Sequence, residues 1–338
     1  MKQIVITKNG GTEVLRLHEK EDPNPGKDQV KIRVKACGVN FADILARKGL
    51  YPDAPPKPCV VGYEVSGMVE SVGENVDQTM IGKAVVALTK FGGYSDVVVA
   101  PTLQVFEKPA SLSFEEGAAI PVTYLTAYQL LVVMGSLRKG ESILIHNAGG
   151  GVGLAALDIA KKIGAVAFGT ASARKHDFLK QRGFDFLIDY RTQDWAKELK
   201  RLTQGKGVEL IIDPLGGKSW KKSYIALRST GRLGIFGVST ISQAKSGGKL
   251  QLIKLVFQTS KFHPFSLMNW NKGVFGVNIG HLWHEAAKVK KWMEEILAGV
   301  QQGWVRPHVD KTFSLAQADQ AHEYIEQRQN IGKVLLIP

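Results

Sequence analysis

The feature that most constrains the fold is a glycine run between two apolar segments, in SILIHNAGGGVGLAALDIA. Residues 142–146 have the composition and length of a buried strand. After the glycines, apolar residues recur on one helical face, at Val152, Ala156, Ile159 and Ile163. A strand, a glycine turn and a helix in that order predict the start of a βαβ unit, and such units build parallel sheets.

Strand and helix continue to alternate after this unit. Further strands are predicted at 165–171, 184–190, 207–217 and 231–238. Helices are predicted between them, at 175–183 and 194–204. This alternation predicts an α/β protein with a doubly wound parallel sheet.

The chain on either side of this region has a different pattern. Residues 1–122 contain β-branched runs with frequent glycines and one short helical stretch at 41–49, which predicts a β-rich domain. After 281, a long helix, a shorter helix and a closing strand are predicted, at 282–303, 315–329 and 332–338. We expect the closing strand to return to the first domain. The domains would then be 1–122, completed by 281–338, and 123–280.

Composition excludes several classes of protein. The 338 residues carry a net charge of +13, which favours anionic partners. No zinc finger, RNA-binding aromatic motif or basic arm is found, so we expect no nucleic acid partner. No apolar run is long enough to cross a membrane and no signal peptide is found, so we expect a cytoplasmic protein. Cys37 and Cys59 are expected to be reduced thiols, although a disulfide between them stays open.

The glycine run matches a dinucleotide-binding fingerprint in two of its three slots. Ala148, Gly150 and Gly153 occupy the slots, so alanine fills the first. Gly150 would let the backbone approach a pyrophosphate, and Gly153 would allow close packing of helix and strand. The alternative is a flexible turn, which does not explain the sheet pattern on both sides.

The residues after the second strand favour NADPH as the cofactor. An NAD enzyme usually has an acidic residue there to bind the ribose hydroxyls. This chain instead has Ser172, Arg174 and Lys175, and no carboxylate before Asp177. A hydroxyl and two cations suit a ribose 2′-phosphate. The alternative is that both cations are solvated charges at a helix start.

Several segments resemble the quinone oxidoreductase branch of the medium-chain dehydrogenase/reductases, to which the zeta-crystallin-like enzymes belong. They include GVNFADILARKGLYP, YLTAYQLL, HNAGGGVGLAA, FGTASARKH, IDPLGG and NIGKVLLIP. Within that branch the chain is most similar to the vesicle amine transport protein homologues. The resemblance spans the whole chain and implies a GroES-like β-rich catalytic domain, a Rossmann domain and a cofactor cleft between them.

The resemblance also implies which residues form the site. Asn40 and Thr126 would lie near the nicotinamide, and Tyr51 would face the substrate. The pyrophosphate would be bordered by Gly150, Gly151, Val152 and Gly153, and the 2′-phosphate by Ser172, Lys175 and Tyr190. The cofactor wall would be completed by Phe236, Gly237, Phe275 and Lys333.

The zinc ligands of related enzymes are replaced in this chain. A cysteine of the zinc-dependent relatives occupies the slot of Asn40, and a histidine occupies the slot of Tyr63. A catalytic zinc site needs about three protein ligands, so we expect no metal. His281 and His284 have helical spacing but no third ligand nearby, and a helix start is the preferred interpretation.

Without a metal to polarise a carbonyl, the substrate must already be electrophilic. Quinones and α,β-unsaturated carbonyls accept hydride directly, and the protein then has to orient them and bind the resulting oxyanion. Asn40, Tyr51 and Tyr63 are the candidate catalytic donors. The alternatives are that Asn40 caps the helix at 41–49 and that the tyrosines only pack. We therefore predict an NADPH-dependent, metal-independent reductase.

A second hypothesis is a vesicle-type protein that contacts lipid and binds NADPH with little turnover. Residues 245–272 contain five lysines, no acidic residue and many large apolar residues, as an anionic membrane surface would require. The alternative is an insert that packs over the cleft or at a dimer contact. The family implies a homodimer, which the strand near 273–280 would form by pairing at the sheet edge.

Overall fold

The computed structural model describes residues 1–240 and 261–338, which form two compact units. Unit 1 comprises Met1–Leu125, Ile279–Gly303 and Pro307–Pro338. Unit 2 comprises Thr126–Asn278 and Trp304–Arg306. The predicted α/β class is confirmed, because one unit is β-rich and the other is built on a parallel sheet.

Unit 1 is built on a seven-stranded sheet, most of it antiparallel. Its strand order is β14-β15-β3-β4-β5-β7, and β6 also pairs with β3. The strands are β3 (Gln29–Val39), β4 (Glu64–Val72), β5 (Ala84–Leu88), β6 (Val97–Pro101), β7 (Val105–Glu107), β14 (Val309–Ser314) and β15 (Lys333–Ile337). A separate pair is formed by β1 (Lys2–Ile6) and β2 (Leu15–Glu19). Inward-facing valines and isoleucines of β1, β3, β4 and β5 form the core.

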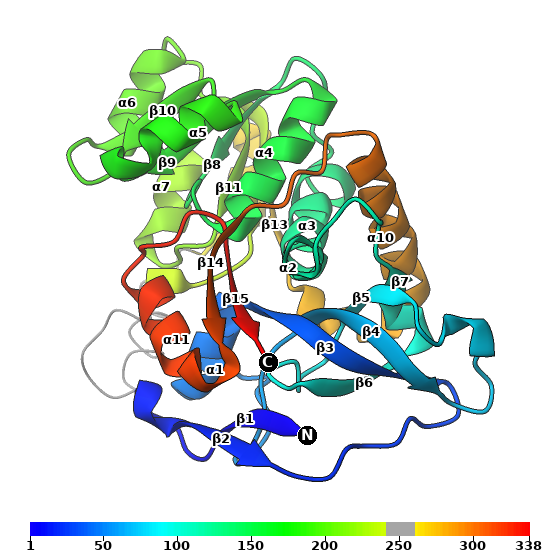
Figure 1. The fold of residues 1–338 in the computed structure, drawn as a ribbon. Helices are drawn as coiled ribbons and strands as arrows, with labels where there is room; N and C mark the ends of the chain where they lie inside the picture. The colour runs from blue at the N-terminus through cyan, green and yellow to red at the C-terminus, as the bar shows by residue number, and fades with distance from the viewer. Residues whose placement is uncertain (241–260) are drawn as a thin grey trace. The chain divides into compact units, whose positions relative to one another are not determined.

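The closing strand of the chain, β15, lies in the sheet of unit 1. β15 pairs antiparallel with β3, so that Val334 lies opposite Val39 and Leu336 opposite Cys37 (Figure 1). The helices of unit 1 are α1 (Phe41–Arg47), α2 (Phe114–Ala118), the start of α3 (Pro121–Tyr128), α10 (Ala286–Gln301) and α11 (Ala318–Glu326). Because α1 begins where β3 ends, the pairing brings the start of β15 beside the start of α1.

Unit 2 is a six-stranded parallel sheet in the order β10-β9-β8-β11-β12-β13. Its strands are β8 (Ser142–Ile145), β9 (Val166–Ala171), β10 (Phe186–Asp189), β11 (Val208–Asp213), β12 (Leu227–Ile235) and β13 (Gly273–Gly276). Its helices are α4 (Gly151–Ile163), α5 (His176–Arg182), α6 (Trp195–Leu202), α7 (Lys218–Ala226) and α9 (Pro264–Trp270). Renumbered within the unit, the order is 3-2-1-4-5-6, the usual order of a Rossmann fold.

This order has a functional consequence. The strand order reverses between β8 and β11, and ligands of such sheets bind outside the carboxyl ends of the strands at that point. The glycine run follows β8 directly. The sheet therefore places it at the position where the fold binds ligands.

One predicted helix start is wrong. The helix predicted at 282–303 begins only at Ala286, and two short 3-10 turns precede it, at Ile279–His281 and Trp283–Glu285. The side chain of Glu285, at the N-cap position, makes no capping hydrogen bond, and His281 Nε2 is held 2.6 Å from Asp53 Oδ2. The apolar residues Leu282 and Trp283 extend the helical pattern to the N-terminal side of Ala286, where the regular helix begins, so the pattern overestimated the helix.

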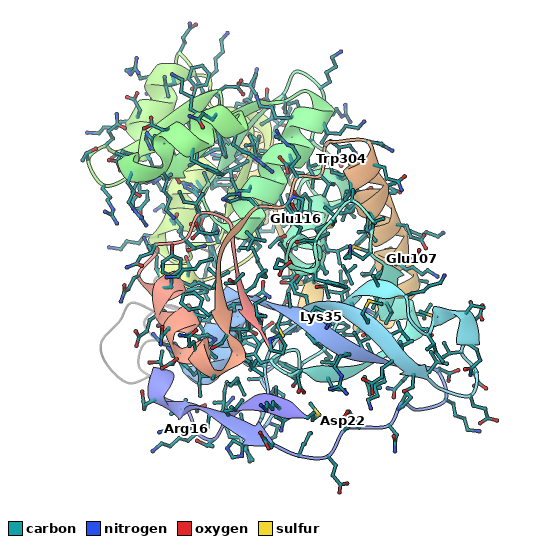
Figure 2. The ribbon with its side chains drawn as sticks, in the orientation of Figure 1. Arg16, Asp22, Lys35, Glu107, Glu116 and Trp304 are labelled. Atoms are coloured by element: carbon teal, nitrogen blue, oxygen red, sulfur yellow. The ribbon has the colours of Figure 1, made fainter. Side chains whose placement is uncertain are left out.

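Charged side chains on unit 1 form one connected ion cluster. Asp22, labelled in Figure 2, lies 3.1 Å from Lys31 Nζ and 2.9 Å from an Arg33 nitrogen. Glu70 contacts the same two cations at 2.8 Å. The cluster fastens the segment after β2 to β3 and β4.

Within the described ranges, no helix is both long enough and apolar enough to cross a bilayer.

Candidate functional site

The glycine loop of unit 2 has room for backbone but not for side chains. Gly150 is the N-cap of α4, and a Cβ added to it would lie 2.6 Å from Asn147 Nδ2. A Cβ on Gly153 would lie 2.6 Å from the carbonyl oxygens of Asn147 and Ala148. The first amides of α4 have no carbonyl of a preceding turn to bind, so they and the helix dipole favour an anion there.

A buried lysine lies against this loop. Ser172 follows β9, and Lys175 ends the short turn after it. The Lys175 side chain is only 6% exposed, and a Cβ added to Gly149 would lie 2.8 Å from its Cδ. Arg174 is exposed. The loop, the helix start and the lysine together fit a phosphate-bearing dinucleotide.

The other residues predicted to bind the cofactor lie at the carboxyl edge of the sheet of unit 2, within β13, and in α3 and β15. Tyr190 follows β10, and Phe236 and Gly237 follow β12, so they share the carboxyl edge of the sheet with the glycine loop. Phe275 lies inside β13, opposite Gly234. Thr126 lies in α3, and Lys333 opens β15 in unit 1. The roles of all of them in binding the cofactor stay predictions.

Unit 2 also contains a buried polar set that sequence reasoning missed. His146 Nε2 lies 3.2 Å from Ser223 Oγ, which donates to Asp213 Oδ2 at 2.7 Å. Thr170 Oγ1 lies 2.9 Å from His146 Nδ1. Burial lowers the pKa of His146, which keeps the imidazole neutral. Because the serine proton goes to the carboxylate and not to the imidazole, the set is structural and does not activate a nucleophile.

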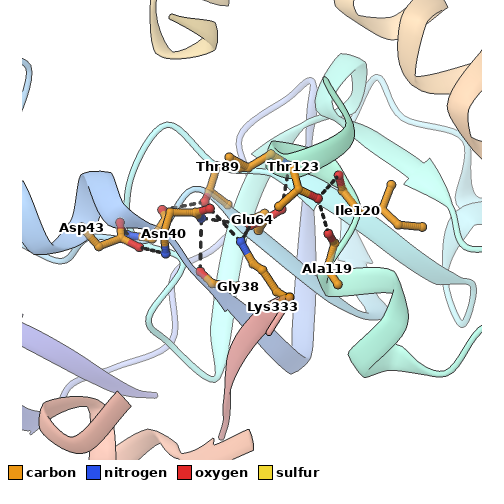
Figure 3. A network of polar contacts seen from close by, with 12 residues as sticks. Gly38, Asn40, Asp43, Glu64, Thr89, Ala119, Ile120, Thr123 and Lys333 are labelled. Carbon is orange, nitrogen blue, oxygen red and sulfur yellow. Dashed lines mark hydrogen bonds and ion pairs between the residues drawn. The ribbon is translucent and has the colours of Figure 1, made fainter. Parts of the chain in front are cut away.

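In unit 1, Asn40 is the centre of a buried polar network (Figure 3). Asn40 Oδ1 accepts a hydrogen bond from Lys333 Nζ at 2.7 Å, and its Nδ2 donates to Glu64 Oε1 at 2.9 Å. Lys333 Nζ also forms an ion pair with Glu64 Oε1. The second carboxylate oxygen of Glu64 accepts from the backbone N–H of Val122, at the start of α3, at 2.7 Å.

This network changes the interpretation of two predicted residues. Asn40 occupies the N-cap position of α1, but its side chain makes no capping hydrogen bond and is turned to Glu64 and Lys333. Glu64, which the sequence analysis did not select, links both. The only signal for Glu64 in the sequence is its place directly after Tyr63, in the frame that carries a zinc ligand in related enzymes.

A second buried carboxylate lies beside the first. Asp43 accepts backbone hydrogen bonds from Asn40 at 2.8 Å and Gly62 at 3.1 Å. Burial is the main cause that raises the pKa of Asp43 to about 7, against the lowering effect of these donors and of the Lys333 charge. Its carboxyl therefore changes charge near neutral pH.

Asp43 is also the first member of a buried chain of polar side chains. Tyr94 Oη donates to Asp43 at 3.1 Å and lies 2.9 Å from His322 Nε2. Arg47 Nη1 lies 3.3 Å from His322 Nδ1, and Arg47 Nη2 donates to Glu326 at 2.6 Å. Burial, with the Arg47 charge, lowers the pKa of His322 well below its usual value. This chain ties α1 to α11 and was not visible in the sequence.

The predicted tyrosines lie together in an aromatic cluster. The rings of Tyr51 and Tyr63 meet edge to face with centroids 6.4 Å apart, and Phe91 lies 5.1 Å from Tyr63. The Tyr63 hydroxyl is buried and makes no hydrogen bond of ordinary geometry to a described residue. Burial, followed by the nearby Asp43 charge, raises the pKa of Tyr63, so the hydroxyl stays protonated.

The described residues contain few side chains that are placed to bind a metal ion together. In residues 1–240 and 261–338, no group of three or more His, Cys, Asp or Glu side chains could hold a metal ion. His281 contacts Asp53 and does not contribute to such a group. Cys37 and Cys59 are free thiols, as expected.

Comparisons with known proteins match this architecture. A family model described as an alcohol dehydrogenase GroES-like domain matches residues 26–110, and one described as a zinc-binding dehydrogenase matches 182–336. The synaptic vesicle membrane protein VAT-1 homolog of Danio rerio is 38% identical over 337 residues, which are 99% of this chain and 69% of that protein. The human quinone oxidoreductase is 30% identical over 341 residues, covering 100% and 98%. The structure of the Escherichia coli quinone oxidoreductase complexed with NADPH superposes with a TM-score of 0.87 at 31% identity, covering both chains fully.

The raised pKa of Asp43 predicts a pH dependence of stability. Between its ordinary value of 3.8 and about 7, the folded state holds a proton that the unfolded state has lost. The free energy of unfolding should therefore fall as the pH rises through this window, by up to about 1.4 kcal/mol per pH unit. Asp43→Asn should remove that slope in urea unfolding curves from pH 4 to 7.5.

Asp77→Asn is the matched control. Asp77 is an exposed acid whose pKa is lowered by hydrogen bonds from Thr79, so its contribution to stability is lost only at pH values below this window. The control should keep the wild-type slope between pH 5 and 7. Equal slopes in the wild type and Asp43→Asn would contradict a protonated Asp43 in the folded protein.

Proposed function

Because the chain belongs to the medium-chain dehydrogenase/reductase superfamily, in the branch of the quinone oxidoreductases and VAT-1 homologues, we propose that it reduces quinones or α,β-unsaturated carbonyls. The protein is an oxidoreductase of that superfamily and binds NADPH. We propose further that it works without a metal, since asparagine and tyrosine occupy the zinc-ligand slots. A cytoplasmic location is part of the same proposal.

The cofactor is proposed to bind at the glycine loop of unit 2. Gly150–Gly153 would hold the pyrophosphate at the start of α4, where a side chain on Gly150 or Gly153 would clash. Ser172, Lys175 and Tyr190 would surround the 2′-phosphate. Lys175 is the strongest of these assignments, because its cation is already buried against the loop.

The observation that carries the proposed reaction is the buried hydroxyl of Tyr63, which interacts with the Tyr51 side chain but has no hydrogen bond of ordinary geometry to a described residue. A buried polar group without a partner is unfavourable by roughly 1–3 kcal/mol, so it suits a site where a ligand supplies the missing acceptor. Tyr51 and Phe91 surround it with flat apolar surface. A quinone or enone offers both a flat ring or double bond and a carbonyl oxygen.

The chemistry then needs little from the protein. Bound NADPH supplies a hydride, and negative charge develops on the carbonyl oxygen of the substrate. Tyr63, kept protonated by its raised pKa, would donate a hydrogen bond to that oxygen. Asn40 is the less available donor, because its amide already binds Glu64 and, at 3.5 Å, the carbonyl of Gly38. Tyr51 would orient the substrate.

Turnover tests the proposed reaction. The purified protein should oxidise NADPH when quinones or 2-alkenals are added, measured by the loss of NADPH absorbance. Tyr63→Phe should lower kcat/KM by roughly tenfold to a hundredfold, because it removes one donor to the oxyanion. Tyr324→Phe is the control, since its hydroxyl binds Asp310 in a different part of unit 1. A wild-type protein that reduces no member of either class would refute the proposal.

The choice of cofactor has its own test. Lys175→Ala should weaken NADPH binding by roughly 1–3 kcal/mol, the effect of one lost charged hydrogen bond, and leave NADH binding unchanged. Dissociation constants from fluorescence titration measure both. Lys180→Ala, which removes an exposed lysine of α5, should affect neither. An equal loss for both cofactors would show that Lys175 does not read the phosphate.

A second candidate function, contact with an anionic membrane, is supported by one surface of unit 2. The predicted insert at 245–272 lies outside the described residues up to 260. From 261 onward, α9 exposes Phe265, Met268 and Trp270 to 68%, 69% and 62%. Ile225, at the end of α7, is 66% exposed beside it, and Lys272 Nζ binds the Tyr224 carbonyl at 3.1 Å between them.

The charged residues within α7 and α9 are all lysines, and one of them, Lys222, forms an ion pair with Asp194. α7 contributes Lys218, Lys221 and Lys222, and neither α7 nor α9 contains an acidic residue. Exposed aromatic side chains among lysines are typical of surfaces that dock on anionic bilayers.

We also propose a homodimer through β13, which is the last strand of its sheet and has an unpaired edge in the described residues.

Vesicle binding tests the membrane proposal. The double variant Phe265→Ser, Trp270→Ser should reduce co-sedimentation with phosphatidylserine vesicles by about tenfold or more, because two large apolar side chains no longer insert. Leu103→Ser removes an exposed leucine of unit 1 and should bind as the wild type does. No binding of the wild-type protein, or equal binding to vesicles of phosphatidylcholine alone, would end the proposal.

A further inference from the structure

The ion pair of Lys333 with Glu64 is unusual because both charges are buried. The side chain of Lys333 is 4% exposed and that of Glu64 is fully buried. Removing two charges from water is unfavourable by several kcal/mol per ion, so a buried pair is weak evidence for stability alone. A function that uses one of the charges would explain why the pair is present at this place.

The donors and acceptors in the network are not balanced. Asn40 uses its oxygen for Lys333 and its amide hydrogens for Glu64 and, weakly, for Gly38. Glu64 uses its two oxygens for Lys333, Asn40 and the Val122 N–H. Lys333 has three N–H donors but binds two acceptors, so one N–H is without a partner among the described residues.

The group of this network that can bind a ligand is therefore the remaining N–H of the Lys333 ammonium, a positively charged donor held in a fixed position. Figure 3 shows the Lys333 ammonium between Asn40, which joins β3 to α1, and Glu64, the first residue of β4. Neither the amide of Asn40 nor the carboxylate of Glu64 has an equivalent group left over. A fixed donor with charge is the kind of group that stabilises an oxyanion, and it acts most strongly where water is excluded.

We propose that Lys333 is a second group, besides Tyr63, that stabilises the developing oxyanion of the substrate, and that Glu64 and Asn40 are positioning residues that hold its ammonium in place. The inference rests on the proposed reductase function and deepens it. When hydride adds to the substrate, the carbonyl π electrons move onto oxygen, and the third N–H of Lys333 binds that anion. The oxygen then takes a proton from the ammonium, and the amine takes one from water, so that one proton is consumed for each substrate reduced.

This inference differs from the cofactor role that the family resemblance implies for Lys333. A cofactor-binding lysine would change the affinity for NADPH. A lysine that binds the oxyanion would change kcat and the affinity for an anionic oxygen, while NADPH binding stays nearly the same. The two roles can therefore be separated by measuring both quantities on the same variants.

The experiment compares Lys333→Met and the double variant Glu64→Gln, Lys333→Met with the wild-type chain. The double variant leaves no lone buried charge, so it keeps the test open if the single variant fails to fold. Lys108→Met is the control, because Lys108 is another buried lysine of unit 1 whose ammonium binds the carbonyls of Pro109 and Leu112 and lies over the Phe114 ring. Three quantities are measured for each: kcat with a quinone, the Kd of NADPH, and the Kd of 4-nitrophenolate against that of neutral 4-nitroanisole, with NADP⁺ present.

Both Lys333 variants should lose at least about tenfold in kcat and about tenfold in affinity for the phenolate, as expected for one oxyanion donor. The Kd values of NADPH and nitroanisole should change less than about threefold, and Lys108→Met should change nothing. Weaker NADPH binding with unchanged phenolate affinity would assign Lys333 to the cofactor and overturn the inference. Unchanged values throughout would make the pair structural and overturn it as well.

The phenolate measurement does not depend on turnover. If the wild type reduced no quinone, the proposed function would fail, but a preference for phenolate that disappears in the Lys333 variants would still support the charged donor. If the wild type showed no such preference, the inference would fail whatever the turnover.

Discussion

The antiparallel pairing of β15 with β3 is the constraint on which the site in unit 1 depends. It brings residues from the end of the chain beside the point where β3 ends and α1 begins. Lys333 can reach Asn40 and Glu64 only because this register is held. A shift of one residue would turn every side chain of β15 to the opposite face of the sheet, and would remove the lysine from the network.

The same pairing explains why Asn40 does not act as an ordinary helix cap. An N-cap asparagine usually binds a free N–H of the first turn. Here Asp43 binds the Asn40 N–H from inside the helix, while the Asn40 side chain binds Lys333 and Glu64. Asn40 thus has its backbone N–H bound within the first turn of the helix, as capping residues often do, while its side chain makes contacts with residues that are distant in the sequence. Asn40 therefore occupies the N-cap position, but its side chain contacts Glu64 and Lys333 instead of the helix.

The features that sequence reasoning predicted are those whose partners are close in the chain. The strand, glycine run and helix at 142–163 lie within one local segment, and Lys175 follows the next strand. The network of unit 1 joins residues 24 and 293 positions apart, from Asn40 to Glu64 and from Asn40 to Lys333. Glu64 carries no pattern of its own that marks it, since a single acid before an apolar strand is common. His322 was missed for the same reason, because its partners Tyr94 and Arg47 are 228 and 275 residues away.

The two buried carboxyl groups of unit 1, those of Glu64 and Asp43, differ in the groups that contact them. Glu64 lies against an ammonium, and two further donors bind its oxygens. Asp43 has only dipolar donors in direct contact, from two backbone amides and the Tyr94 hydroxyl, and burial raises its pKa to about 7. Lys333 therefore forms an ion pair with Glu64 and also lies near the Asp43 carboxyl, whose charge is fractional at neutral pH. Protonation of Asp43 leaves the positive charge of Lys333 less compensated, and a less compensated ammonium attracts an oxyanion more strongly. The charge that this network would present to an oxyanion thus depends on Asp43, although this carboxyl accepts hydrogen bonds from backbone amides and tyrosine and makes no hydrogen bond to the lysine.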